Sequence, residues 1–136
     1  MSGEFLKRIR PSGIVSAEHI ADVGAGLAPS DRTEREGAEI IKRLRARDSL
    51  VLLRDDGKEL NSAAFASYLS QKMADTAGRV VFAIGGAWGV SNSVEQRADD
   101  GLSMSRMTFT HEMCFLFLTE QIYRAFSILE GSGYHH

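Results

Sequence analysis

Residues 80–89 read VVFAIGGAWG, in which five apolar side chains pass directly into a glycine-rich loop. A short continuous apolar run of this kind, here taken from Arg79 to Ile84, is typical of a strand buried on both faces of a parallel sheet. The glycines that follow, Gly85 and Gly86, let the backbone approach a ligand closely. The stretch therefore predicts a buried strand whose carboxyl end carries a loop that could bind a ligand.

The loop by itself leaves two interpretations open. Its glycine spacing differs from that of the dinucleotide fingerprint, and nowhere in the sequence is Gly-Lys followed by Ser or Thr, as a phosphate-binding P-loop requires. A tight strand-to-helix turn without any ligand explains the same glycines equally well. The choice between them depends on the rest of the chain.

Strand and helix signals alternate on both sides of this stretch. Upstream, Ser49 to Leu53 is a second continuous apolar run that ends at Asp55-Asp56-Gly57, which predicts a buried strand followed by a turn. A capping box formed by Asp31 and Glu34 begins the first helix, and Gly101 closes the helix that starts at Ser93. The helical spacing of apolar side chains predicts helices over Asp31 to Arg47, Ser62 to Ala74 and Ser93 to Asp100. The alternation is typical of an α/β fold with a parallel sheet and helices on both faces, whose ligands bind at the carboxyl ends of the strands.

The amino-terminal part of the chain predicts a helix end, a strand and a loop. Glu4 to Arg10 reads as a helix end that Pro11 closes. Ile14 to Val23 reads as a strand, and Gly24 to Pro29, which is poor in large apolar groups, reads as a loop.

The last helix is predicted from His111 to Leu129, with Thr110 as its cap and Gly131 as its stop. It is apolar almost all round at its start, so it needs cover on more than one side. In a chain this small, we expect that cover to come from a second subunit as well as from the core, which predicts a homodimer.

Composition fits one globular domain over residues 1–136. Hydrophobic residues make up 43% and charged residues 25% of the chain. The net charge of -2 excludes a globally basic nucleic-acid binder, so any RNA contact must come from a local patch. Cys114 is the only cysteine, which excludes an internal disulfide and favours a reducing compartment, the cytoplasm. No apolar run reaches the roughly 20 residues that span a bilayer, so we expect no membrane insertion.

Two further segments hold side chains that could carry chemistry. Leu102 to His111 mixes small hydroxyls with Met and Phe, a composition that can line an adenine slot, although Ser and Thr that merely cap a helix explain it as well. Tyr123-Arg124 lies on the last helix, and Tyr134-His135-His136 reads as a plain terminal segment, a purification-tag remnant or a partial metal site. Two histidines without a third ligand are weak evidence for zinc, so we expect no metal.

In combination and in order, four segments resemble the SPOUT-class family that methylates N3 of a pseudouridine in bacterial large-subunit ribosomal RNA. They are VVFAIGGAWG, LSMSRMTFTH from Leu102, EQIYRAFSI from Glu120 and GYHH from Gly133. Weaker similarity extends upstream through EGAEIIKRL from Glu36, VLLRDDGKEL from Val51 and SAAFASYL from Ser62. The resemblance covers roughly the last hundred residues, and GYHH is also a family ending, which favours that reading over a tag.

The resemblance implies a deep trefoil knot at the carboxyl end, a homodimer, and S-adenosyl-L-methionine bound in the knot, which is an exception to unthreaded topology. It also implies transfer of a methyl group to a pseudouridine of 23S rRNA on the ribosome. Arg124 is expected to hold phosphate or the developing negative base, with Tyr134 and His135 closing the acceptor site. By matching position, cofactor contacts are expected at Leu53, Gly85, Gly86, Met104, Ser105, Arg106, Met107, Thr108 and Phe109.

Three differences from the family pattern keep an alternative open. The chain begins at the expected helix Glu4 to Ile9, before which the family has a first core strand. Phe115 replaces an arginine, and Arg54 replaces an acidic residue beside the expected cofactor site. The alternative is a catalytically impaired knotted dimer that binds cofactor or ribosome without turnover. A generic doubly wound nucleotide-binding protein, unknotted and with no particular affinity for sulfonium ligands, is a third hypothesis.

Overall fold

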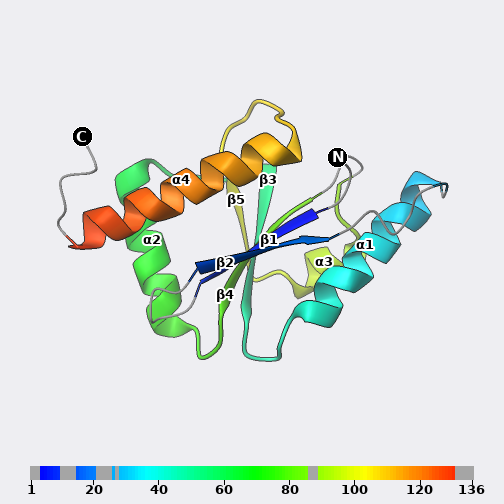
Figure 1. The fold of residues 1–136 in the computed structure, drawn as a ribbon, viewed down its shortest axis with the longest axis horizontal. Helices are drawn as coiled ribbons and strands as arrows, with labels where there is room; N and C mark the ends of the chain where they lie inside the picture. Colours follow the sequence, from blue (N-terminus) through cyan, green and yellow to red (C-terminus); the bar gives the residue numbers. More distant parts are fainter. Residues whose placement is uncertain (1–3, 10–14, 21–25, 27, 86–88, 131–136) are drawn as a thin grey trace.

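The computed structural model describes residues 4–9, 15–20, 26, 28–85 and 89–130 (Figure 1). In these residues five strands and four helices are found. The strands are β1 Glu4–Ile9, β2 Val15–Ile20, β3 Ser49–Glu59, β4 Val80–Ile84 and β5 Asp100–Ser103. The helices are α1 Pro29–Arg43, α2 Ser62–Asp75, α3 Asn92–Arg97 and α4 His111–Glu130.

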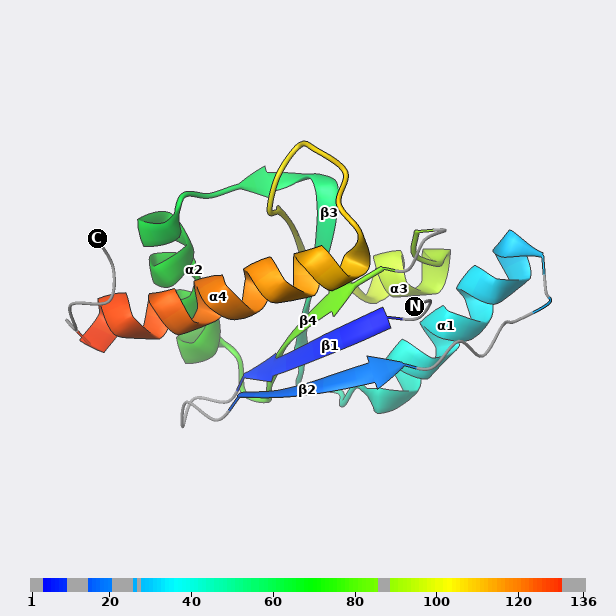
Figure 2. The same cartoon turned by 45° about the horizontal axis from the view of Figure 1, so that its top comes forward.

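The strands form one mixed sheet in the order β2-β1-β4-β3-β5. The strands β4, β3 and β5 run parallel, whereas β1 runs antiparallel to both β4 and β2. Figure 2 shows β2, β1 and β4 beside one another under α4. The predicted parallel sheet is thus confirmed for its three carboxyl-terminal strands and wrong for the two amino-terminal ones.

The two faces of β4 pack into separate hydrophobic cores. Phe82 lies in the core that α2 and α4 cover, and Val81 and Ala83 lie in the core that α1 and α3 cover. Figure 1 shows these helix pairs on opposite sides of the sheet. Burial on both faces explains why β4 is apolar at every position, so helices on both faces of the sheet are confirmed.

The helix predicted at the amino-terminal end is wrong, because Glu4–Ile9 forms the strand β1. Six residues are too few for a stable helix, and the otherwise free side of β4 offers them backbone partners. With β1 in place, β4 is paired on both sides, so the expected gap of a missing strand next to β4 is absent from the described sheet. The strand predicted within Ile14 to Val23 is confirmed as β2.

The first helix begins earlier than predicted. Its amino-terminal cap is Ala28, which makes no side-chain hydrogen bond, and Pro29 opens the first turn. Asp31 therefore lies inside that first turn, and the predicted capping box is wrong. The helix also ends at Arg43 instead of Arg47. Of the loop predicted before it, Gly26 and Ala28 are the only described residues that precede the helix.

The helices α2 and α4 confirm their predictions. The Asn61 side chain accepts a hydrogen bond from the N–H of Ala64 and caps α2, and the Thr110 hydroxyl accepts one from the N–H of Met113 and caps α4. The predicted stop at Gly131 lies outside the described residues.

The helix predicted up to Asp100 is wrong in its last turn. The helix α3 ends at Arg97, and Asp100–Ser103 is the short strand β5, so Gly101 lies in a strand and does not close a helix. The N–H of Leu50 donates to the Asp99 carboxylate and the N–H of Asp99 donates to the Leu50 carbonyl, which fixes the entry to β5 beside β3. Pairing with a distant strand thus overrides the local helical pattern here.

The strand β3 pairs with β5 twice. Leu102 lies opposite Leu53 and again opposite Lys58, and the ladder is irregular between them. The predicted turn at Asp55-Asp56-Gly57 is therefore an excursion within one long strand and not its end. At Gly57 the strands β3 and β5 are so close that a Cβ added there would lie 2.6 Å from the carbonyl carbon of Leu102.

Candidate functional site

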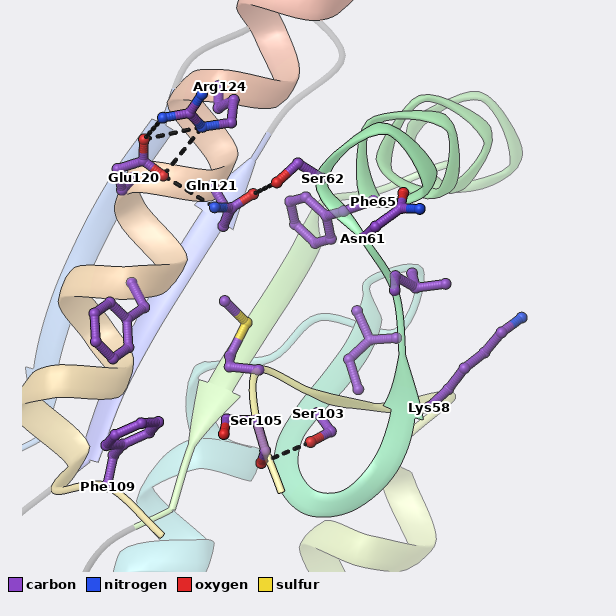
Figure 3. A pocket seen from close by; sticks show the side chains of 14 residues that line it. Lys58, Asn61, Ser62, Phe65, Ser103, Ser105, Phe109, Glu120, Gln121 and Arg124 are labelled. Atoms are coloured by element: carbon purple, nitrogen blue, oxygen red, sulfur yellow. Dashed lines mark hydrogen bonds and ion pairs between the residues drawn. The ribbon is translucent and has the colours of Figure 1, made fainter. Parts of the chain in front are cut away.

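Two cavities lie on either side of the segment that joins β5 to α4. The strand-end cavity, of about 880 Å³, lies at the carboxyl ends of β3 and β4 and extends to the start of α4. The inter-helix cavity, of about 720 Å³, lies between the start of α2, the end of β5 and the middle of α4 (Figure 3). Both volumes are in the range of small-molecule sites, roughly 300–1,000 Å³. Met104, Ser105 and Phe109 line both cavities.

The strand-end cavity brings together most of the residues predicted to contact a cofactor. Those that line it are Leu53, Gly85, Met104, Ser105, Met107, Thr108 and Phe109. Arg106 is not among them: its guanidinium pairs with Glu59 at 2.9 Å and donates to the Asp55 carbonyl at 2.7 Å. Gly86 lies outside the described residues.

Carboxylates dominate the charge of the strand-end cavity. Among the described residues that line it, Asp55, Asp56, Glu95 and Glu112 stand against one guanidinium, that of Arg54, with His111 at the start of α4. The Glu112 carboxyl keeps its charge readily, because a hydrogen bond from its own backbone N–H and the nearby His111 lower its pKa. The cavity is therefore suited to a ligand that carries positive charge.

Arg54 bridges two of these carboxylates. Its Nε donates to Asp56, and its Nη1 lies 3.4 Å from an oxygen of Glu95 on α3. The hydrogen bond from Arg54 is the main cause of the lowered pKa of Asp56. Gly101 makes room for this side chain, since a Cβ there would lie 3.1 Å from Cδ of Arg54. The charge reversal expected from Arg54 is thus offset by acidic neighbours, and the cavity stays negative overall.

Hydroxyl groups hold the segment between the cavities in shape. The Ser103 hydroxyl donates to the Ser105 carbonyl at 2.9 Å, and the Ser105 hydroxyl accepts from the N–H of Met107 at 3.0 Å. Thr110 caps α4. These three hydroxyls therefore have the local structural role that we kept open as an alternative, while Met107 and Phe109 remain exposed beside the cavity.

Arg124 lies in the inter-helix cavity and not among the residues that line the strand-end cavity. A chain of hydrogen bonds, visible in Figure 3, runs along its upper rim: Ser62 donates to Gln121 at 2.8 Å, Gln121 to Glu120 at 3.0 Å, and Arg124 to Glu120 at 3.0 Å. Three predicted cofactor residues, Met104, Ser105 and Phe109, line this cavity together with Arg124, and they form the wall that separates Arg124 from the strand-end cavity. Tyr134 and His135 lie outside the described residues.

Sequence reasoning missed several residues that line the cavities. Glu95 and Glu112 stand in the first turns of α3 and α4, where a carboxylate is common for helix reasons alone, so nothing singled them out. Cys114 lines the strand-end cavity, and burial raises the pKa of its thiol. Lys58 lines the inter-helix cavity because β3 continues past its predicted end.

Phe115, at the position of the expected arginine, is half-buried and packs against the core that α2 and α4 cover. Its side chain contributes to that core and carries no charge toward a substrate.

Two general findings concern the described part of the chain. No helix there is both long and apolar enough to cross a membrane. No group of three or more His, Cys, Asp or Glu side chains there is arranged to hold a metal ion.

Comparison with known proteins gives consistent matches. A family model described as "Predicted SPOUT methyltransferase" matches residues 1–135. A Porphyromonas gingivalis protein named ribosomal RNA large subunit methyltransferase H is 43% identical over 135 residues, which cover 98% of this chain and 86% of the relative. Proteins of the same name are 47% identical over 110 residues in Bacteroides thetaiotaomicron, with 81% and 70% covered, and 38% identical over 132 residues in Nitratidesulfovibrio vulgaris, with 97% and 85% covered.

Proposed function

The chain belongs to the SPOUT methyltransferase family, within the group of ribosomal RNA large subunit methyltransferase H, and on that premise we propose that it methylates large-subunit ribosomal RNA with S-adenosyl-L-methionine as donor. The acceptor that goes with this group is N3 of a pseudouridine in 23S rRNA, on the assembled ribosome in the cytoplasm. The single observation that carries the proposal is the strand-end cavity. It is lined by residues from the carboxyl ends of β3 and β4 and from the segment before α4.

The residues of the strand-end cavity fit the donor in size and in charge. When bound, the donor supplies an electrophilic methyl group on a positively charged sulfur. Four carboxylates against one guanidinium stabilise such a cation. Leu53 and Met104 offer apolar surface to the adenine, and Gly85 lets the backbone approach its edge. We assign the donor to this cavity.

The acceptor side of the proposal rests on Arg124. We assign its guanidinium to an RNA phosphate or to the negative charge that develops on the base, with Glu120 holding it in place. Tyr134 and His135 complete the acceptor site in the proposal, with the histidine as acceptor of the imide proton.

The proposal includes the knotted path of this family. Its support is the double pairing of Leu102 with Leu53 and Lys58, because it places β5 against a strand that bends away and returns. Gly57 permits the close contact at that crossing.

The proposal also includes a homodimer. Met113, Leu116 and Tyr123 are exposed on α4, at spacings of three and seven residues that put them on one side of the helix. Met107, just before α4, is also exposed. An apolar stripe of this kind on a helix that already packs against the core is best covered by a second copy of the chain.

Two measurements test the function. Calorimetry with S-adenosyl-L-methionine is expected to show binding, and incubation with ribosomes that lack the modification is expected to transfer the methyl group to 23S rRNA. Absence of binding at millimolar ligand contradicts the proposal. Binding without transfer favours the alternative, a knotted dimer that has lost turnover, for which the replacement of the arginine by Phe115 is the motivating observation.

A further inference from the structure

We infer that the inter-helix cavity is a binding site for a single pyrimidine nucleotide turned out of its RNA strand, with its base between aromatic side chains and its phosphates on Lys58 and Arg124. The inference rests on the proposed function, since it assigns a place to the acceptor. It separates the acceptor cavity from the donor cavity, which lie on the two sides of one wall.

The wall between the cavities is formed by residues that line both of them. Met104, Ser105 and Phe109 line both sides of it. A methionine side chain is unbranched and changes its conformation easily, so movement of Met104 can connect the two spaces. Reacting atoms must come within about 3–3.5 Å of each other, which ligands in the two cavities can reach once Met104 has moved from between them.

Aromatic rings face the inter-helix cavity from both sides. Phe65 on α2 is only 5% exposed and borders the cavity from the core, and Figure 3 shows Phe109 on the opposite side, next to α4. The Phe109 ring packs edge-on against Phe117, with 5.3 Å between ring centres, so that the two form one surface. A base that leaves its stack is held in enzymes by stacking between such rings.

The charge of the inter-helix cavity is opposite to that of the strand-end cavity. Lys58 and Arg124 stand against Glu120 among the described residues that line it. The two cations lie at opposite ends of the cavity in Figure 3, as contacts to successive phosphates would require. Because the chain as a whole carries a net charge of -2, this local excess of positive charge is the kind of patch that RNA binding needs.

Asn61 supplies a hydrogen-bond donor at the mouth of this cavity. Its side-chain oxygen is used to cap α2, through the bond from the N–H of Ala64. The amide NH₂ group of the same side chain is the half that remains to meet a ligand. Uracil-type bases present carbonyl oxygens, which accept from such a group.

The first test compares Lys58→Glu with Lys42→Glu, an equal charge change at an exposed position on α1. Lys58→Glu is expected to raise KM for ribosomes at least about tenfold, while the Kd for S-adenosyl-L-methionine stays within about twofold. Lys42→Glu is expected to leave both values unchanged. If Lys58→Glu keeps the KM for ribosomes of the wild type, or weakens donor binding to the same extent, the inference is overturned.

The second test uses Asn61→Asp, which preserves the capping oxygen and removes the amide donor. Thermal unfolding should therefore match the wild type, while KM for ribosomes rises. Pseudouridine 5′-monophosphate, titrated at millimolar concentration, is expected to shift the NMR signals of Asn61, Phe65 and Gln121, and S-adenosyl-L-methionine those of Val90 and Cys114. Shifts of the first set by the donor, or of the second set by the nucleotide, contradict the separate assignment.

The inference and the proposed function fail in different ways. If the wild-type protein does not methylate 23S rRNA, the function fails whatever the nucleotide does. If it methylates 23S rRNA and both cavity variants are as active as the wild type, the function stands and the acceptor site is elsewhere.

Discussion

The guanidinium of Arg79 donates to both carboxylate oxygens of Asp48, and the two side chains are only 5% and 1% exposed. Asp48 directly precedes β3 and Arg79 directly precedes β4, so the pair joins the amino ends of two neighbouring parallel strands. The N–H groups of Arg45 and Arg79 also donate to the carboxylate. The pair thus fixes the sheet at the amino ends of these strands, opposite to the end that carries the two cavities.

Removing one partner of this pair is expected to destabilise the protein strongly. Asp48→Asn leaves the Arg79 guanidinium buried without its counter-charge, which costs about 3–5 kcal/mol in the free energy of unfolding. Urea denaturation measures the loss. Asp75→Asn, at an exposed carboxylate that accepts from Gln71, is the control and should stay within about 0.5 kcal/mol of the wild type. Equal effects of the two variants would exclude the stabilising role of the pair.

The same carboxyl makes stability depend on pH in the acid range. Burial alone would raise the pKa of Asp48, but the hydrogen bonds from Arg79 and from two backbone N–H groups outweigh it and lower the pKa to about 2. A folded pKa below the unfolded value stabilises the protein above pH about 4, and the contribution, ~2 kcal/mol, is lost as the pH falls toward 2. Denaturation of wild type and Asp48→Asn between pH 2 and 6 should show that the wild type alone loses this contribution.

A side chain at Gly57 is expected to disrupt the crossing of β3 and β5. In Gly57→Ala the new Cβ would meet the backbone of Leu102 at 2.6 Å, and backbone cannot move aside as a flexible side chain can. We expect a loss of about 2 kcal/mol or more, together with weaker donor binding. In Gly101→Ala the new Cβ lies 3.1 Å from the flexible Arg54 side chain and at an ordinary contact distance of 3.9 Å from the Leu52 carbonyl, so the change should cost less than about 1 kcal/mol. Calorimetry and denaturation of both variants check the order.

Arg54 is expected to reduce the preference of the strand-end cavity for a cation. Arg54→Ala removes the guanidinium that neutralises Asp56 and Glu95. The ratio of Kd for S-adenosylhomocysteine, which lacks the sulfonium charge, to Kd for S-adenosyl-L-methionine should rise about three- to tenfold, and more at low salt. A ratio that does not change would mean that the donor's charge is not sensed in this cavity.

Arg124→Ala is expected to affect the RNA and not the donor. Because Arg124 lines the inter-helix cavity, kcat/KM for ribosomes should fall about a hundredfold or more while the Kd for S-adenosyl-L-methionine is unchanged. Arg35→Ala, at an exposed position on α1, is the matched control and should have wild-type kinetics. If Arg124→Ala loses donor affinity to the same extent as turnover, Arg124 acts on the donor, and its assignment to the RNA is wrong.

The exposed stripe on α4 is expected to hold two copies of the chain together. Leu116→Glu places a charge in the middle of that stripe and should shift the protein from dimer to monomer in sedimentation experiments. Ala38→Glu, on the exposed side of α1, should leave the mass unchanged. A wild-type protein that sediments as a monomer contradicts the dimer outright.

The sequence predicted the elements whose own side chains determine them. The apolar run of β4 and the spacing of Phe65 and Leu69 on α2 specify burial without reference to distant residues. The strand β1 was mistaken for a helix because a six-residue mixed segment has no clear period, and its strand partner decides its conformation.

The sequence predicted the site residues that directly follow a strand, and it did not predict the others. Gly85 and the Met104 to Phe109 segment follow β4 and β5 directly, so strand ends locate them. The strand β5 is only four residues long and begins with Asp-Gly, which resembles a turn, so its pairing with β3 could not be inferred. The separation of Arg124 into a second cavity depends on that pairing, and it is therefore a property of the tertiary structure alone.

The double pairing of β3 with β5 also dictates the order in which the molecule can be assembled. Contacts between residues far apart in the chain form slowly, because the intervening chain must first lose its freedom. Both cavities are walled by Met104, Ser105 and Phe109, and the inter-helix cavity needs α4 in addition. During synthesis at the ribosome, a nascent chain that has not yet emerged past these residues has neither cavity. The protein therefore acquires its complete ligand sites only after α4 has emerged from the ribosome.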